Sequence, residues 1–395
     1  MSPFRLSPKD KTSLTAFLRD LVQTPSPSTQ EGALAERITV EMTKLGLRNV
    51  HVDCAGNVVG RIGAGHGPLL MLDGHMDTVR ISTPETWHHT PFGAEVKNGT
   101  LYGLGACDMK GGLAAMIYAA MLLHDVKLKG DVVVACVVQE EPCEGMGVQV
   151  LIEKEGVHPD WVVLGEPTDL NVSRGQRGRL EMHLTAHGCS AHAACPDLGS
   201  NAIYAAARLV FGLELLAEQL GNDAFLGPGT LAVTNVSSGT SGGNVIPDRC
   251  ELIIDRRLTL GENETMALAE VQRVIAREGI QAQVKVAEHD VTSYTGHAYH
   301  KRAFYPAWVI AEDHPLVAAT LQAVRVQTRQ RPQISRWDFS TDGVYTAGVA
   351  GIPTVGFGPG DPHHAHTADE HVRLEDVHAA AEVYAQLAVE LLGTE

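Results

Sequence analysis

Continuous apolar runs alternate with segments of helical spacing along the chain, and this pattern predicts an α/β protein. Three runs, within residues 69–77, 131–138 and 161–164, are apolar over most of their length. Such runs are typical of strands buried on both faces of a mostly parallel sheet that is flanked by helices. Ser7 followed by Pro8 predicts the first helix, because a serine N-cap and a proline at the first helical position both favour helix initiation.

The next segments add helices and turns to this framework. Apolar spacing predicts a second helix that Gly46 ends, and residues 50–61 alternate as a hairpin. The glycine-rich segment 103–112 precedes an apolar helix at 113–123. It lacks the Gly-Lys-Ser/Thr of a phosphate-binding P-loop, so we expect its glycines to bring one acid, Asp108, into a crowded place.

The pattern changes at residue 180, and the chain is longer than one hydrophobic core usually grows. The patterns that follow have the order strand, helix, strand, strand, helix, strand, which is that of a ferredoxin-like α+β unit. They fall near residues 181–186, 203–220, 231–236, 251–255, 265–278 and 281–286. We therefore predict a catalytic domain made of residues 1–179 and 298–395, with residues 180–297 inserted as a second domain.

The composition narrows the class of protein. With a formal net charge of -16, the chain lacks the basic surface that nucleic-acid binding requires, and this charge suits a site that collects divalent cations. The 7 cysteines form no repeated C-x-x-C pair, so we expect reduced thiols and a cytoplasmic protein. No apolar run reaches the ~20 residues that span a bilayer, so we expect neither a membrane nor a nucleic-acid partner.

Residues that can bind metal stand at the ends of the three apolar runs. His75 and Asp77 end the first run, Glu140 and Glu141 follow the second, and Glu166 follows the third. In an open α/β sheet the ligand crevice lies outside the carboxyl ends of the strands, so we expect these side chains to converge. His75 and Asp77 point to one face, so the imidazole can bind metal while the carboxylate holds its other nitrogen.

One more acid and a late histidine cluster complete the ligand candidates. Asp108 comes from the glycine-rich segment, and one imidazole comes from His363, His364 or His366. Mixed histidine and carboxylate ligands without thiolate suit a catalytic Zn²⁺ site, and Mn²⁺ or Co²⁺ fit the same ligand logic. Two histidines and three carboxylates are too many for one tetrahedral ion with a water, so we expect two ions about 3.5–4 Å apart.

Taken together, these motifs resemble the co-catalytic zinc amidohydrolase family of acetylornithine deacetylase, succinyl-diaminopimelate desuccinylase, glutamate carboxypeptidase and related dipeptidases. The matching segments are Gly74–Val79, Gly105–Gly112, Glu140–Glu141, Gly165–Pro167 and His366–Glu370. Their order and spacing cover nearly the whole chain. One departure is Leu104, where many relatives carry arginine.

The resemblance implies a zinc-peptidase-like catalytic domain with an inserted lid and dimerisation domain. It also implies a ligand set: His75 and Glu166 on one zinc, Glu141 and His366 on the other, and Asp108 bridging the two. Only His366 of the late histidines fits the His-x-x-Asp-Glu pattern. Asp77 would orient His75, and Glu140 would be the general base.

For the inserted domain the resemblance implies further roles. The segment around His192 matches one whose histidine reaches across a dimer interface to the partner's active site, where it would stabilise the tetrahedral oxyanion. A homodimer through this domain is therefore expected. Asn244 and Arg257 match positions that bind the substrate's carboxylate, and the planar fork of arginine suits that task. Arg256 is the alternative if the register differs by one residue.

Within the family the chain looks most like a subgroup labelled selenium-metabolism-linked hydrolases, a label that names no reaction. The segments that carry this likeness are residues 175–179, 255–259, 339–343 and 356–360. The last of them contains Gly358, which we expect at the substrate-binding site.

The expected activity is hydrolysis of an amide bond in a small substrate that bears a free carboxylate. A water would lose its proton to Glu140, attack the carbonyl, and the proton would return to the departing amine. An N-acyl amino acid is the first choice of substrate, and a short peptide is the alternative. An inactive metal-bound scaffold is a third hypothesis, although every ligand position and the position of the base are filled here.

Overall fold

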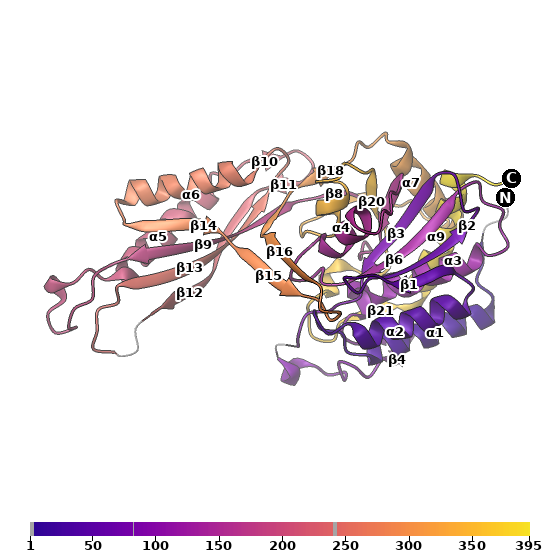
Figure 1. Ribbon diagram of the computed structural model, residues 1–395, viewed down its shortest axis with the longest axis horizontal. Coiled ribbons are helices and arrows are strands. Elements are labelled where there is room, and N and C mark those ends of the chain that lie inside the picture. The colour runs from indigo at the N-terminus through magenta and orange to yellow at the C-terminus, as the bar shows by residue number, and fades with distance from the viewer. Residues whose placement is uncertain (1–3, 82, 240–242) are drawn as a thin grey trace.

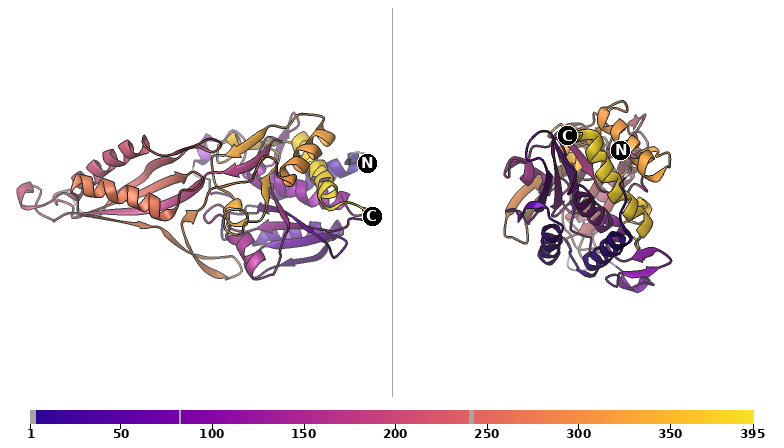
Figure 2. Two further views of the ribbon diagram at one scale, coloured as in Figure 1. Left: turned by 90° about the horizontal axis from the view of Figure 1, so that it is seen from above. Right: turned by 90° about the vertical axis from the view of Figure 1, so that its right-hand side faces the viewer.

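The computed structural model describes residues 4–81, 83–239 and 243–395. The molecule is elongated, with two lobes side by side along its long axis (Figure 1). Both termini lie at the outer end of the larger lobe, and the segment after residue 180 forms the narrower one (Figure 2). No helix of the described chain is long and apolar enough to cross a bilayer.

A nine-stranded mixed sheet forms the centre of the larger lobe. The three apolar runs become the strands at its middle, where β3 pairs in parallel with both β6 and β7 as predicted. The strands in sheet order are β1 (Arg48–Val52), β2 (Val58–Gly63), β6 (Asp131–Val137), β3 (Leu69–His75), β7 (Trp161–Leu164), β20 (Thr354–Gly356), β8 (Val172–Gln176) and β18 (Trp308–Val309), with β19 (Ile334–Trp337) also paired to β8. Every residue of β3 and β6 is buried.

Helices bury both faces of this sheet. One face carries α1 (Pro8–Gln23), α2 (Gly32–Lys44), α3 (Gly111–Leu122), α7 (Pro315–Thr328) and α9 (Leu374–Leu392), and the other carries α4 (Met146–Glu153) and α8 (Gly343–Thr346). The predicted start of α1 is confirmed, because the Ser7 side chain accepts from the backbone of Asp10 in a capping box. The predicted hairpin of β1 and β2 and the apolar helix α3 are also present.

The narrower lobe is the predicted ferredoxin-like unit. Its elements in chain order are β9 (Gly178–His187), α5 (Ala202–Ala217), β12 (Thr230–Ser238), β13 (Arg249–Leu258), α6 (Glu264–Glu278) and β14 (Ala282–Val286), and its sheet order is β12-β13-β9-β14. Both helices pack on one face of the sheet. The chain then forms the hairpin of β15 (Glu288–Thr292) and β16 (Ala298–Arg302), and β17 (Phe304–Tyr305) pairs with β9. The domain limits at residues 180 and 297 stay a prediction.

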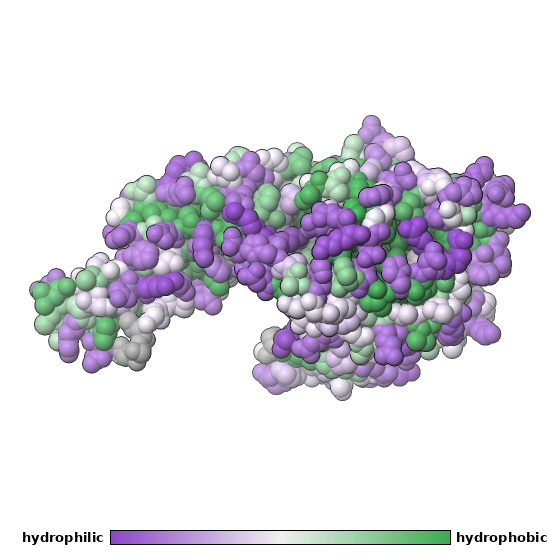
Figure 3. All heavy atoms as spheres, in the orientation of Figure 1, coloured by the Kyte–Doolittle hydropathy of each residue, from purple (hydrophilic) through white to green (hydrophobic). Residues whose placement is uncertain are grey.

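Apolar side chains are exposed on this inserted lobe, and Figure 3 shows some of them at its free end. Tyr204, Phe211 and Leu215 share one side of α5, because residues seven and four positions apart lie on one helix face. Leu198, Val236 and Val245 are exposed near the same end or along β12. Strand β12 is an edge of the sheet.

Short elements complete the fold. They are the small sheet of β4 (Glu95–Lys97), β5 (Thr100–Tyr102) and β21 (His371–Arg373), the pair β10 (Asn222–Asp223) and β11 (Gly227–Pro228), and the single turns η1 (Pro84–Thr86), η2 (Ala106–Lys110), η3 (Pro196–Leu198) and η4 (Pro362–His364). All seven cysteines are free thiols, as expected.

Candidate metal centre and active site

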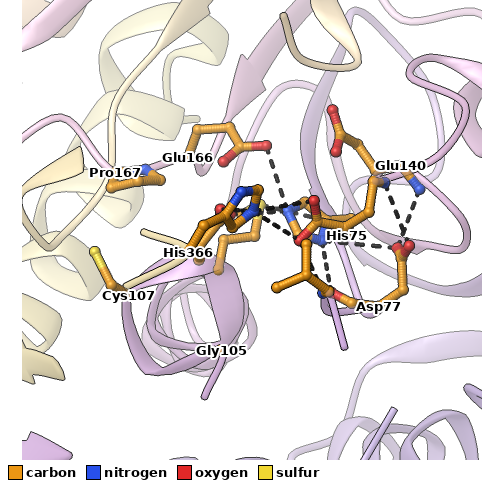
Figure 4. Close-up of polar contacts among 12 residues, drawn as sticks. His75, Asp77, Gly105, Cys107, Glu140, Glu166, Pro167 and His366 are labelled. Carbon is orange, nitrogen blue, oxygen red and sulfur yellow. Dashed lines mark hydrogen bonds and ion pairs between the residues drawn. The ribbon is translucent and has the colours of Figure 1, made fainter. Parts of the chain in front are cut away.

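The predicted ligand residues converge at the carboxyl ends of three neighbouring strands. His75 is the last residue of β3, Glu141 follows β6, and Glu166 follows β7. Asp108 lies in the turn η2, and His366 comes from the loop between β20 and β21. Figure 4 shows that the side chains of His75, Glu166 and His366 come from separate parts of the chain and lie close together. The structure therefore brings the predicted strand-end residues together at one place, and their roles stay a prediction.

One side of the cluster centres on His75. Its Nε2 lies 3.0 Å from Asp108 Oδ1 and 3.6 Å from Glu166 Oε1. Its Nδ1 is 2.9 Å from the backbone oxygen of Asp77, which fixes the ring. Nε2 is thus the nitrogen directed at the two carboxylates.

The other side centres on His366. Its Nε2 lies 3.2 Å from Asp108 Oδ2 and 3.1 Å from Glu141 Oε2. Asp108 thus directs one carboxylate oxygen to each histidine. His363 bonds to Asp361 and remains highly exposed, and the ring of His364 lies against that of His371 with their centroids 4.0 Å apart, so neither joins the cluster.

These donors fit two divalent cations. Bonds of roughly 2.0–2.2 Å in a tetrahedral zinc site put neighbouring donor atoms roughly 3.3–3.6 Å apart, close to the separations seen here. His75, Asp108 and Glu141 each offer a donor atom within 4.8 Å of the others, and so do His75, Glu140 and Glu166. Glu140 is therefore also near enough to His75 and Glu166 to be a ligand.

The charge balance of the cluster also favours cations. Burial raises the pKa of Glu140 and of Glu166 well above the usual range. Burial alone would lower the pKa of His75, but the charge of Glu166 and the contact with Asp108 raise it well above its usual value. Hydrogen bonds to Asp108 and Glu141 raise the pKa of His366 to about 11. The surrounding carboxylates thus favour the protonated, positively charged imidazoles. Bound cations would supply this positive charge instead.

A cavity of about 280 Å³ opens beside this cluster. Its far wall comes from the inserted lobe and carries Arg179 and Arg257, which are directly opposite each other on β9 and β13. Arg179 contacts Glu144 at 3.1 Å and Asp255 at 3.1 Å, and Arg257 contacts Asp255 at 2.7 Å. The carboxylates offset the repulsion between the two arginines. The cavity therefore joins a carboxylate-rich metal wall to a wall of paired arginines.

Comparison with known proteins assigns the family. The sequence profile of peptidase family M20/M25/M40 matches residues 71–390, a span that contains every ligand candidate. The chain belongs to peptidase family M20/M25/M40. It is thus a hydrolase of C–N bonds in a metal-dependent family, which confirms the predicted class and the family resemblance.

Two curated relatives and one solved structure illustrate the similarity. The uncharacterized protein YgeY of Escherichia coli K12 is 38% identical over 400 residues, covering 100% of this chain and 99% of the relative. Succinyl-diaminopimelate desuccinylase of Marinobacter nauticus is 30% identical over 390 residues, covering 95% of this chain and 97% of the relative. The solved structure of the YXEP protein of Bacillus subtilis, a dinuclear metal binding peptidase of family M20, matches with a TM-score of 0.71 at 19% identity. The match covers 98% of this chain and 99% of that one. The selenium-linked subgroup stays a prediction.

In this M20 fold, Asp77 acts differently from the sequence-based expectation. Its carboxylate lies 3.7 Å from His75 Nδ1, farther than its own backbone oxygen. The carboxylate instead accepts hydrogen bonds from the backbone amides of Glu140 and Glu141 and from the Ser28 hydroxyl. Asp77 therefore orients the histidine through its main chain and the two glutamates through its side chain.

Sequence reasoning missed the role of Glu370. Its buried carboxylate accepts from the backbone amides of Gly105, Cys107 and Asp108 at 3.0, 2.9 and 2.9 Å. These bonds fix the turn that presents Asp108 to both histidines. The sequence signal was the acid that ends the His-x-x-Asp-Glu pattern.

The glycine-rich segment has the predicted tight approach. A Cβ at Gly112 would lie 2.2 Å from the carbonyl oxygen of Gly165, so only glycine lets the start of α3 pack against the strand end that carries Glu166.

Two further acids lie beneath the cluster. Asp73 is fully buried on β3, and neither of its carboxylate oxygens has a hydrogen-bond partner within the described chain. Burial and the neighbouring Asp342 raise its pKa well above the usual range. Asp342 accepts from the backbone amide of Gly145, and burial raises its pKa to about 6. Burial and the like charge of Asp342 thus both favour the protonated form of Asp73.

The remaining predicted site residues fall in three places. Arg257 lines the cavity, whereas Arg256 is buried and bonded to Glu262. Gly358 lies behind Glu166, and its backbone groups bond to Thr168. His192 and Asn244 lie together beyond the far end of β9, where Ala193 N donates to Asn244 O. Since β9 has 10 residues, its ends lie roughly 30 Å apart.

Proposed function

We propose that the chain removes the acyl group from an N-acyl amino acid at a pair of divalent cations, with Zn²⁺ as the first candidate and Co²⁺ or Mn²⁺ as alternatives. The observation that carries the proposal is the Asp108 carboxylate, which directs one oxygen to each of two histidines that each have a carboxylate of their own. His75 and Glu166 would bind one cation, and His366 and Glu141 the other. The pair, when bound, would polarise the carbonyl and lower the pKa of a water.

Glu140 is the proposed general base. It is buried at the rim of the cluster, and its Oε1 has no hydrogen-bond partner within the described residues, so this oxygen can accept a proton. The backbone amides of Glu140 and Glu141 donate to the Asp77 carboxylate, and these bonds hold the two glutamates in fixed relative positions. Glu140 would take the proton of the attacking water and deliver it to the departing amine.

The substrate carboxylate is assigned to the arginine wall. Two of the guanidinium nitrogens of Arg257 contact Asp255, so the third is left to bind a carboxylate. Gly358 and Asn244 are kept as candidate substrate residues, Gly358 through its position behind Glu166 and Asn244 through a partner subunit. The desuccinylase relative acts on an N-acyl amino acid, and this supports the proposed substrate class.

The proposed homodimer would bring the free end of the inserted lobe to the site. His192 and Asn244 lie roughly one strand length from the cavity of their own chain. The exposed Tyr204, Phe211 and Leu215 and the edge strand β12 provide an apolar surface next to this end. A two-fold pairing through that surface would let His192 of each chain stabilise the oxyanion in the partner's site.

The test is a matched pair of variants. Glu140→Gln should keep the metal content near wild type and lower kcat by ~10²–10⁴-fold, the usual value of a general base. Glu141→Gln, at the next residue, should lose the cation shared with His366. Wild-type turnover in Glu140→Gln would exclude Glu140 as the base. Loss of metal from Glu140→Gln but not from Glu141→Gln would make Glu140 the ligand and Glu141 the base.

Substrate class is tested by direct assay. Purified protein should be offered N-acetyl, N-succinyl, N-formyl and N-carbamoyl amino acids beside dipeptides and tripeptides. Release of the free amino acid from an N-acyl compound supports the proposal, and exclusive cleavage of peptides supports the alternative. No turnover of any compound by fully metallated protein would favour the inactive scaffold.

A further inference from the structure

The hairpin of β15 and β16 leaves the inserted lobe and lies against the catalytic lobe. It follows β14 and leads into β17, and both of these strands pair with β9. Figure 1 shows the hairpin crossing between the lobes toward β1 and α2. The hairpin is therefore a physical connection between the sheet of the inserted lobe and the surface around the candidate active site.

The turn of the hairpin is anchored on the catalytic lobe. The Tyr294 hydroxyl donates to the backbone oxygen of Gly56 at 2.9 Å, and the Thr295 hydroxyl donates to that of Cys54 at 2.7 Å. The Tyr294 ring packs so closely on Gly56 that a Cβ there would lie 2.3 Å from a ring carbon. This contact fixes where the hairpin lies but does not reach the metal-ligand candidates.

The second strand of the hairpin contacts the segment that carries the two catalytic glutamates. The Tyr299 hydroxyl donates to Gln139 Oε1 at 2.6 Å, and Lys301 Nζ donates to the backbone oxygen of Glu144 at 2.5 Å. These two bonds fall on either side of Glu140 and Glu141 in the sequence. The hairpin therefore spans the segment.

Gln139 is an unusual residue on which to build this contact. It is fully buried, and its φ of 59° lies in the left-handed region that non-glycine residues rarely adopt. Its Nε2 has no hydrogen-bond partner within the described chain, whereas its Oε1 accepts the bond from Tyr299. Asp77 holds the backbone of Glu140 and Glu141. The base is thus fixed by the catalytic lobe through Asp77 and by the hairpin through Gln139.

We propose that the hairpin positions the general base, with Tyr299 and Lys301 as its positioning residues, so that the placement of the inserted lobe sets the orientation of Glu140. The proposal rests on the proposed role of Glu140. Neither residue touches the reacting atoms. Their effect would act on the catalytic step, while metal and substrate binding would be largely unchanged.

Tyr299→Phe is the direct test, and Tyr294→Phe is its matched control. Both variants remove one hydroxyl from the same hairpin and keep the ring. Tyr299→Phe should lower kcat roughly tenfold, the order of one buried hydrogen bond lost, with KM and metal content near wild type. Tyr294→Phe should leave kcat at the wild-type value, because its ring still packs on Gly56 and the Thr295 bond to Cys54 still holds the turn in place.

Hydrogen exchange provides a readout that does not depend on activity. Tyr299→Phe should speed amide exchange in residues 139–145, and Tyr294→Phe should speed it only around residues 53–57. Adding Gln139→Met to Tyr299→Phe should recover part of the lost kcat, since removing both polar partners costs less than leaving one buried and unpaired.

Identical kcat and identical exchange at 139–145 in the two tyrosine variants would overturn the proposal, as would a tenfold loss in both. If Glu140→Gln kept full activity while Tyr299→Phe still loosened 139–145, the hairpin contact would stand and the assignment of the base would fall. The failures of the two proposals are therefore distinguishable.

Discussion

Two regions depart in opposite ways from the usual rule that charged side chains are exposed and apolar side chains are buried. They are the crevice at the ends of β3, β6 and β7 and the free end of the inserted lobe. In the crevice, ionisable side chains are buried: His75 is 1% exposed, and Glu140 and Glu166 are each 5% exposed. At the free end, apolar side chains are exposed: Tyr204 at 72% and Phe211 at 66%. Buried charge is costly without a counter-charge, and an apolar patch is costly in water. These departures motivate the two occupants that we propose, divalent cations in the crevice and a second copy of the chain at the free end.

The largest effect is expected where the two halves of the crevice share a residue. Asp108→Ala removes the oxygen directed to each histidine, so both cations should be lost and activity with them. Metal analysis after dialysis checks this against wild type, which should bind up to two ions per chain. Asp73→Asn changes a buried acid next to the ligand set and is the control. It should keep more metal than Asp108→Ala. A stoichiometry that never exceeds one in zinc-supplemented wild type would contradict the paired site.

The sequence predicted the crevice well because buried parallel strands have a local signature. The apolar runs located β3, β6 and β7, and the rule for strand ends then brought His75, Glu141 and Glu166 together. The alternation rule placed Asp77 on the correct face. It could not tell which atom of Asp77 meets His75, because that depends on the amides of the neighbouring strand.

Other features have no such local signature. The cradle around Glu370 is made of backbone amides, which every residue has. Asp73 lies in an apolar strand, where a single acid does not reveal that it faces Asp342 across the fold. The hairpin 288–302 has a polar, irregular pattern and gave no signal of a strand pair. Long-range contacts of this kind need the assembled fold.

The second prediction tests the apolar free end. Phe211→Glu puts a charge on the exposed side of α5 and should convert the proposed dimer to a monomer, with activity falling to the level of His192→Ala. Sedimentation or light scattering measures the mass. Val349→Glu is the matched control, because Val349 is 65% exposed on the catalytic lobe. A wild-type protein that is monomeric and fully active would contradict the proposed homodimer.

The third prediction joins the two regions. If His192 acts in the partner's site, mixing inactive Glu140→Gln protein with inactive His192→Ala protein restores activity, because a mixed dimer has one site with both residues intact. Random exchange makes about half of the dimers mixed, so recovery should approach about a quarter of wild type. Subunit exchange must be shown separately with labelled chains. Exchange without recovery would place His192 outside the partner's site.

The smallest effect concerns Glu31, a buried acid outside the proposed ligand set. Glu31 precedes α2 and is fully buried, and its Oε2 has no partner within the described chain. Burial, and next the charge of Asp77, raise its pKa from 4.5 to about 7. Between these values the folded chain holds a proton that the unfolded chain releases, so the free energy of unfolding falls as pH rises.

Glu31→Gln removes this titration. The variant should therefore gain stability relative to wild type as pH rises from about 4.5 to 7, by at most roughly 3 kcal/mol, and the difference should stay constant at higher pH. Urea unfolding of metal-free proteins across this window measures it. Glu36→Gln, on the exposed side of the same helix, is the matched control for the loss of one glutamate. A constant difference between Glu31→Gln and wild type would mean that Glu31 is ionised in the folded protein, and that buried charge near the crevice can persist without a cation.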